Sequence, residues 1–397
     1  MTKKKTSPKK ANSEASKKAS SASGSKSKIK VRQDSHTPKT AKKAGMPCLS
    51  LPQGWLAAVA FFAVCVLLFY PPYFRGLFFD KELLPTHVIT ALIYGLVWAD
   101  KLRRRDLRFI QNPLDYAVLA YAGAYLLSLV GAVHIGDAIK GFLKALNYFM
   151  IYWMVREVVS DYRRYETVLK TLFASALGVA AIGIAAATGY SHYPGAFEAG
   201  RIMSTLQYPN TTATYMAVMS LIGIVLWIRS GNIVERTVYG ISTAVMVLVA
   251  VVAVSKGGWL VLIMGSALLL AGMPGIYRIK TGYSLVLAYA AAALGTIKFL
   301  PAITAGQSRP AFAGLLLTAV TVVLGQLVWE GLVQCYRTKG CVWTAGIAVG
   351  ILLAAAGIGA GAGLHQRISA EVLPGSLMSR INQFKDIGSS SYASRID

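Results

Sequence analysis

The chain has 397 residues, 55% of them hydrophobic, and carries 41 Lys and Arg against 17 Asp and Glu. Its mean hydropathy of +0.50 is too high for an ordinary soluble domain and indicates a protein that lies largely within a membrane. The first 47 residues hold half of the formal net charge of +24, so the charge and the apolar content are separated along the chain.

Residues 1–47 are rich in Ser, Lys and Ala and contain no aromatic residue. They hold 14 Lys and Arg against only Glu14 and Asp34. Such a segment cannot bury a core, so it is predicted to be a disordered basic tail in the cytoplasm, beside anionic membrane lipids. The alternative is that this tail binds nucleic acid. The membrane-surface interpretation is favoured, so no nucleic acid is expected as a partner.

Apolar stretches long enough to cross a bilayer follow one another through residues 48–364. They predict an all-α fold, a polytopic membrane helix bundle of about 11 spans. Lys140 and Lys144 make the fourth span the weakest. The tight turn at 255–257 divides the seventh span from the eighth, and a single kinked helix is the alternative. The predicted spans are 55–74, 84–100, 114–133, 138–155, 167–187, 209–228, 238–254, 258–275, 283–303, 311–333 and 343–364.

The distribution of cations orients this bundle. The five loops on the side of the N-terminal tail carry 14 Lys and Arg, whereas the five loops on the opposite side carry 5. Cytoplasmic loops are enriched in Lys and Arg, so the N-terminus is predicted to be cytoplasmic, and residues 188–208 and 365–397 to lie outside. Six tryptophans fall near predicted span ends, which is typical of an interfacial belt. They are Trp55, Trp98, Trp153, Trp227, Trp259 and Trp343.

Two isolated cations, Arg201 and Lys256, lie at or beside outward ends of apolar segments, where a fixed charge is costly unless an anionic group needs it. Arg201 lies in the loop 188–208. A guanidinium there can hold a phosphate through two parallel hydrogen bonds. The alternatives are an ordinary solvated loop arginine and an ion pair with Glu198.

Lys256 follows Ser255 and precedes Gly257 and Gly258, between two long apolar runs. Glycine lets the backbone approach a ligand closely, so this patch is a second candidate for anion binding. A lysine that merely extends its side chain to the membrane surface is the alternative. Asn210 follows Pro209 at the start of a span, where it can support the site or serve as a helix N-cap.

The last 33 residues, 365–397, are polar and are followed by no returning span, so the chain is expected to be a truncated piece of a longer protein. Arg380 and Arg395 add positive charge to this segment, although solvated loop arginines would look the same. The sequence contains no P-loop and no Asp/His metal cluster, so neither a metal nor a cofactor is expected.

These patches, in this order, resemble those of the O-antigen ligase and polymerase family of multispan glycan transferases. The first reads Gly200-Arg201 and continues to Pro209-Asn210, and the second reads Ser255-Lys256-Gly257-Gly258. The third reads Ser379-Arg380 and continues to Ser394-Arg395. In two respects the chain departs from the family pattern: Lys256 stands where the family usually has Arg, and the large outer loop ends before the region in which ligases carry a histidine.

The resemblance implies a helical bundle of the GT-C type and a metal-independent transferase at the outer face of a bacterial cytoplasmic membrane. The donor would be a polyprenyl-diphosphate-linked glycan, and the acceptor a glycan, a lipid or a protein. Arg201 and Lys256 would bind the diphosphate, supported by Asn210, Ser255, Gly257, Arg380 and Arg395, and the acid/base residue would lie beyond Asp397.

Three alternatives remain open at this point. One is a transporter or flippase for lipid-linked glycans, and another is a cell-wall glycosyltransferase that uses the same type of lipid carrier. The third is a membrane anchor without catalytic activity.

Overall fold

Long apolar runs form α-helices here, because a helix satisfies its backbone polar groups within its own segment. The computed structural model describes residues 54–339. These residues form ten α-helices, three short 3₁₀ helices and one two-stranded hairpin. The α-helices are α1 (Trp55–Phe69), α2 (Asp80–Arg103), α3 (Pro113–Leu127), α4 (Ile135–Val158), α5 (Tyr162–Ala187), α6 (Pro209–Arg229), α7 (Ile233–Val252), α8 (Lys256–Gly272), α9 (Gly275–Thr304) and α10 (Ser308–Lys339).

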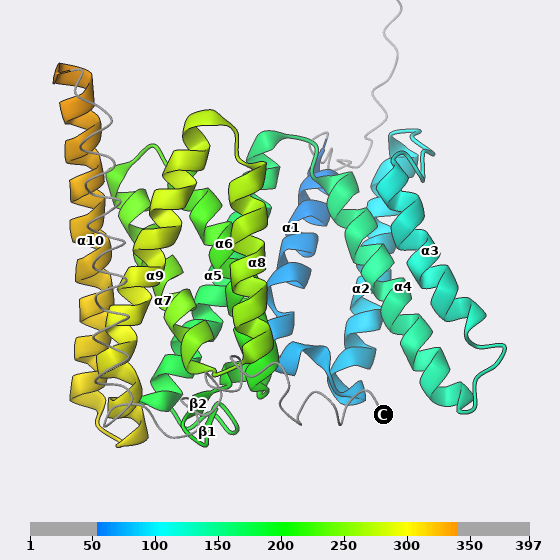
Figure 1. The fold of residues 1–397 in the computed structure, drawn as a ribbon. Coiled ribbons are helices and arrows are strands. Elements are labelled where there is room, and N and C mark those ends of the chain that lie inside the picture. Colours follow the sequence, from blue (N-terminus) through cyan, green and yellow to red (C-terminus); the bar gives the residue numbers. More distant parts are fainter. Residues whose placement is uncertain (1–53, 340–397) are drawn as a thin grey trace, which may run out of the picture. The chain divides into compact units, whose positions relative to one another are not determined.

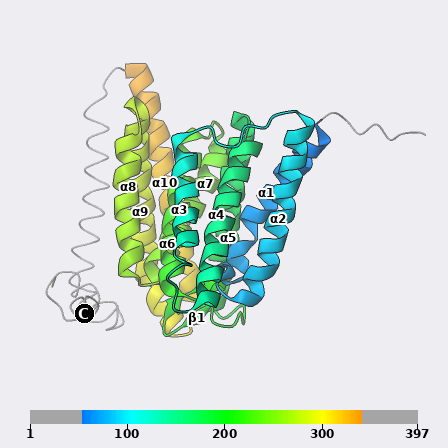
Figure 2. The same ribbon diagram turned by 90° about the vertical axis from the view of Figure 1, so that its right-hand side faces the viewer.

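Successive helices run in alternate directions, so their connections fall at two opposite ends of the bundle (Figure 1). We call the end at which α1 begins the tail side; it holds the connections after α2, α4, α6 and α8. The opposite end, called the far side, holds η1 (Pro71–Tyr73), η2 (Arg75–Leu77), η3 (Ser204–Leu206) and the hairpin of β1 (Phe197–Glu198) and β2 (Arg201–Ile202). The view turned by 90° shows the same alternation (Figure 2).

The helices confirm the prediction of a polytopic helical membrane protein. Each of the first ten predicted spans corresponds to one helix, and seven of these helices are long and apolar enough to cross a membrane. Of the other three, α3 has 15 residues, α8 has 17 residues, and α4 carries Lys140 and Lys144 near its start. The predicted eleventh span, the basic tail 1–47 and the segment 365–397 lie outside the described residues.

The turn between α7 and α8 is a hairpin and not a kink. A Cβ atom on Gly258 would lie 2.4 Å from the Cβ of Ala213, and one on Gly265 would lie 2.5 Å from Leu221, so α8 packs on α6 in parallel. Since α7 follows α6 through the short connection 230–232 and packs against it in the opposite direction, α7 and α8 are antiparallel (Figure 1). This confirms the choice of two helices over one kinked helix.

Buried side chains form one core within α1–α4 and a larger one within α5–α10. In the first core, Trp153 is fully buried, stacks on Trp98 and donates its indole N–H to the carbonyl of Phe109 at 2.9 Å. Trp227 is also buried, in a cluster with α7, α9 and α10. Trp153 and Trp227 lie near the tail-side ends of α4 and α6, as predicted, but their side chains pack inside the bundle and do not face lipid.

Glycines bring α9 and α10 into backbone contact. A Cβ on Gly314 would lie 2.8 Å from the carbonyl oxygen of Gly295, and one on Gly295 would overlap the hydroxyl of Thr318. In a membrane, helices associate largely through such close packing, because lipid offers no hydrophobic driving force between helices.

Ion pairs join α2, α3 and α4 on the tail side. The buried Lys101 ammonium lies 2.9 Å from Asp106 and 2.7 Å from Glu157. Arg156 pairs with Asp115, which also accepts a hydrogen bond from the hydroxyl of Tyr152 at 2.7 Å. A buried charge is tolerated only when paired and hydrogen-bonded, and each of these charges is.

Candidate functional site

The far-side loop 188–208 is fastened to the helix bundle along its length. Thr205 donates its hydroxyl to the carbonyl of Pro72 at 2.7 Å, and Ser204 donates its hydroxyl to the carbonyl of Val179. Ile202 is fully buried and lies against Gly183 of α5, where a Cβ would meet it at 2.7 Å. The loop therefore holds its hairpin in a fixed place on α5.

Arg201 lies on β2 of this hairpin and reaches across to the end of α7. Its Nε donates to the carbonyl oxygen of Ala253 at 3.0 Å, and its Nη2 donates to that of Val254 at 2.7 Å. The last carbonyls of a helix have no partner within the helix and carry a partial negative charge, so a guanidinium there stabilises the helix end. Glu198 faces Arg201 in the register of the hairpin but makes no described ion pair with it.

Val254 occupies a conformation that β-branched residues rarely adopt. Its φ angle is 52°, in the left-handed region. Among the described residues, six of the seven non-glycine positions with positive φ lie on the far side, namely Arg75, Leu77, Ala199, Ser204, Gln207 and Val254. Backbone strain of this kind persists only where surrounding contacts enforce it, and it gathers at functional sites. Arg201 donates one of its hydrogen bonds to the carbonyl of this strained residue.

Ser255 and Lys256 follow this strained turn directly. Ser255 is buried and N-caps α8, since its hydroxyl accepts a hydrogen bond from the backbone N–H of Gly258 at 3.2 Å. Lys256 is half-buried and is the first residue of the helix. Gly257 is exposed, and a Cβ there would meet only the Ser255 hydroxyl, at 4.0 Å. The backbone at the N-terminus of α8 is therefore accessible on the Gly257 side.

Gly258 and the supporting residue Asn210 have roles that differ from the expected ones. Gly258 does not leave room for a ligand; it lets α8 pack against Ala213 of α6. Asn210 is not the N-cap of α6, because Tyr208 holds that position and Pro209 follows as the first helical residue. Asn210 is exposed and donates its side-chain N–H to the hydroxyl of Tyr208 at 3.1 Å.

The structure thus brings Arg201, Ser255, Lys256 and Gly257 together around one turn, with Asn210 at the start of the neighbouring α6. Arg380 and Arg395 lie outside the described residues. Sequence reasoning missed the carbonyls of Ala253 and Val254 as partners of Arg201, since residues 52 and 53 positions apart are linked only by the fold.

Within residues 54–339, no three His, Cys, Asp or Glu side chains come close enough together to hold a metal ion. No protein-family model, no curated protein and no solved structure matches this chain.

Proposed function

We propose that this chain acts in a membrane glycan transferase of the O-antigen ligase or polymerase type, which moves a glycan from a polyprenyl diphosphate to an acceptor. The observation that carries the proposal is the turn 253–256, where Arg201 is bonded to the backbone and Lys256 begins α8. Two cations from segments far apart in the sequence are thereby placed at one point on the far side.

The charge of this turn suits a diphosphate. Lys256 and Arg201 each contribute a unit positive charge, and the first N–H groups of α8 point along a helix dipole whose positive end is here. An arginine has five N–H donors, so anchoring by two carbonyls is compatible with binding an anion as well. In this proposal Lys256 and the N-terminus of α8 contact the diphosphate, while Arg201 holds the turn and adds charge.

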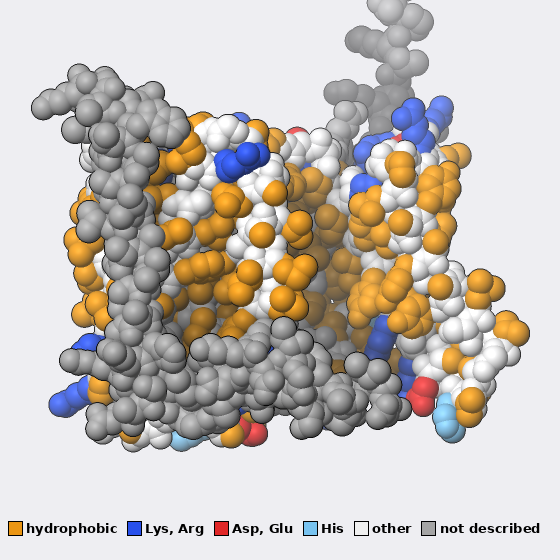
Figure 3. Space-filling view, in the orientation of Figure 1, with side chains coloured by type: hydrophobic (Ala, Val, Ile, Leu, Met, Phe, Trp, Pro, Cys, Tyr) orange, Lys and Arg blue, Asp and Glu red, His pale blue; other side chains and the backbone are white. Residues whose placement is uncertain are grey.

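The same helix offers a path for the lipid. Beyond the turn, α8 exposes Leu260, Ile263, Met264 and Leu268 along its length. Figure 3 shows a hollow between α8 and the side of the bundle formed by α2 and α4, with apolar side chains on its walls. A polyprenyl chain whose diphosphate lies at Lys256 would extend along these surfaces.

The proposed chemistry needs positive charge at the leaving group. An acceptor hydroxyl oxygen bonds to the anomeric carbon of the glycan and passes its proton to water, while the bond from that carbon to the diphosphate oxygen breaks and its electron pair leaves with the diphosphate. The departing polyprenyl diphosphate gains negative charge, which fixed cations in a site of low dielectric constant stabilise.

The test uses the full chain in membranes, with Lys256→Met and Lys256→Arg, and with Arg309→Met as the matched control. Arg309 is exposed at the start of α10, also on the far side, and makes no described hydrogen bond or ion pair. Loss of one charge-assisted contact costs about 2–5 kcal/mol, so Lys256→Met should weaken both transfer and retention of purified polyprenyl diphosphate at least tens-fold.

Lys256→Arg and Arg309→Met should retain both properties, at equal membrane abundance. If Lys256→Met binds and transfers like Arg309→Met, the diphosphate site is not here. If the chain instead carries labelled donor lipid across vesicle membranes without transferring its glycan, it is a transporter.

A further inference from the structure

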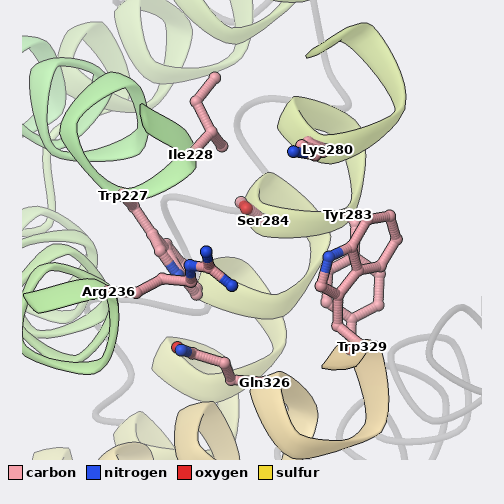
Figure 4. A pocket seen from close by; sticks show the side chains of 8 residues that line it. All are labelled: Trp227, Ile228, Arg236, Lys280, Tyr283, Ser284, Gln326 and Trp329. Atoms are coloured by element: carbon pink, nitrogen blue, oxygen red, sulfur yellow. The ribbon is translucent and has the colours of Figure 1, made fainter. Parts of the chain in front are cut away.

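A second polar pocket lies at the tail side, between the ends of four helices. It is lined by Trp227 and Ile228 of α6, Arg236 of α7, Lys280, Tyr283 and Ser284 of α9, and Gln326 and Trp329 of α10 (Figure 4). The pocket is small, with a cavity volume of about 40 Å³, and it opens at the surface. None of these residues belongs to the turn around Lys256, so the pocket is independent of the proposed transfer site.

Gln326 is the residue that marks this pocket as a binding site. Its side chain is only 3% exposed, and neither its amide nitrogen nor its amide oxygen has a hydrogen-bond partner. A buried amide without partners costs free energy, and such groups in native proteins call for an explanation. Figure 4 shows Gln326 and Arg236 among the side chains that line the pocket, where a ligand would satisfy the amide.

The charges around the pocket favour an anion of low charge. Arg236 and Lys280 are half-buried cations at its wall, and the Arg236 guanidinium pairs with Glu330 and also donates to the carbonyl of Ser230. The Lys280 ammonium lies 5.5 Å from the ring of Tyr277. The negative charge of Glu330 offsets the positive charge of Arg236, so the charge of Lys280 remains. This single positive charge matches the single negative charge of a phosphodiester.

The surroundings indicate that this phosphodiester belongs to a lipid. Beside the pocket, α9 and α10 expose large apolar side chains, including Ile276, Ile279, Leu327 and Val328. Trp329 packs its ring against Tyr283 with the ring centroids 4.6 Å apart, which gives the pocket an aromatic wall. Aromatic and basic side chains at helix ends are typical of the level of lipid headgroups, where basic pockets between helices bind anionic lipids.

We propose that this pocket binds the phosphate of an anionic phospholipid from the tail-side leaflet. Lys280 supplies the charge, and Gln326 and the Ser284 hydroxyl donate hydrogen bonds to phosphate oxygens. The acyl chains lie against the exposed apolar faces of α9 and α10.

The experiment measures how strongly phosphatidylglycerol raises the unfolding temperature of the purified full chain in detergent, and how much of it remains bound in native mass spectrometry. Parallel samples receive phosphatidylcholine, inorganic phosphate or glycerol phosphate. The variants are Lys280→Ala and Gln326→Leu, with Arg278→Ala as the matched control, since Arg278 lies on the same helix end and does not line the pocket.

Phosphatidylglycerol should stabilise the wild type and Arg278→Ala more than the other three additives do. Binding should weaken about tenfold in Lys280→Ala and in Gln326→Leu, the size expected for one hydrogen bond to a charged group. Gln326→Leu should also unfold no earlier than the wild type without lipid, because it removes an unpaired buried amide. Weaker binding of phosphatidylglycerol, together with an unfolding temperature that does not fall in the absence of lipid, would show that Gln326 binds the ligand and does not merely support the fold.

Three results would overturn the proposal. Equal stabilisation by phosphatidylcholine would remove the anion selectivity, and equal stabilisation by inorganic phosphate or glycerol phosphate would make it a site for a soluble anion. Undiminished phosphatidylglycerol binding in both pocket variants would place the lipid elsewhere.

Discussion

Removing the guanidinium of Arg201 should destabilise the far side of the bundle. Arg201→Ala deletes two charge-assisted hydrogen bonds to the carbonyls of Ala253 and Val254, both of which are buried residues. Hydrogen bonds from charged donors contribute about 1.5–3 kcal/mol each. Arg201 is only half-buried, so water can replace part of this, and the loss is expected to be about 2–4 kcal/mol.

Thermal or denaturant unfolding of the purified chain in one detergent measures this loss, with Arg309→Ala as the control that removes an exposed far-side charge for which the described residues show no hydrogen bond or ion pair. Arg201→Lys keeps the charge but cannot span both carbonyls with one ammonium, so its stability should fall between that of the wild type and that of Arg201→Ala. If Arg201→Ala unfolds together with Arg309→Ala, the contacts to α7 contribute nothing and the argument about the turn fails. Because Arg201→Ala changes folding as well as charge, the functional test depends on Lys256.

Two further predictions concern neighbouring glycines and one ion pair. Gly258→Ala should destabilise the chain by about 1–3 kcal/mol, because its Cβ would lie 2.4 Å from that of Ala213 and α8 would have to move from α6. Gly257→Ala, one residue earlier and open to solvent, should leave the unfolding midpoint unchanged or slightly raised, and equal midpoints for the two variants would contradict the packing. The hydrogen bond from Lys101, followed by one from the backbone of Arg108, lowers the pKa of Asp106 below its usual 3.8. Its stabilising effect is therefore present above pH 3.8 and is lost as the pH falls through the lowered pKa. Asp106→Asn should be less stable than the wild type at pH 7, and the difference should shrink steadily as unfolding scans are taken from pH 3.8 to lower pH. A difference that stays constant over that range would contradict the ion pair.

Hydropathy predicted where the described helices lie but not where they begin. The second span was expected from residue 84, yet α2 begins at Asp80, and α5 begins at Tyr162 where residue 167 was expected. Charged residues such as Glu82 and Arg163 form helix readily, and acidic residues favour the first turn of a helix. A hydropathy pattern detects only the apolar run, so it places the start of the helix too late. The direction of every described helix followed correctly from the alternation of loops.

The candidate site could be predicted only as a set of residue types. The positions of Arg201 and Lys256 stood out because a cation beside an apolar run is unusual, and the structure places both at one turn. Their partners could not be predicted, since the contact between β2 and the end of α7 depends on how α5 holds the loop. Gln326 was missed, although an amide within the apolar run 311–333 is itself an unusual choice that could have drawn notice.

The three residues that join α7 to α8 also constrain how the chain enters a membrane. At 1.5 Å per residue, the 17 residues of α8 extend about 26 Å, less than the roughly 30 Å of a hydrocarbon core. Carrying the Lys256 side chain through that core costs about 3 kcal/mol of free energy. The transfer of the apolar side chains of α7 and of the short α8 into lipid must together offset this cost. The two helices should therefore insert as one helical pair. If α7 inserted and α8 failed to return, Lys256 would still reach the far side, but α9 and α10 would enter in the inverted orientation and the tail-side pocket could not assemble.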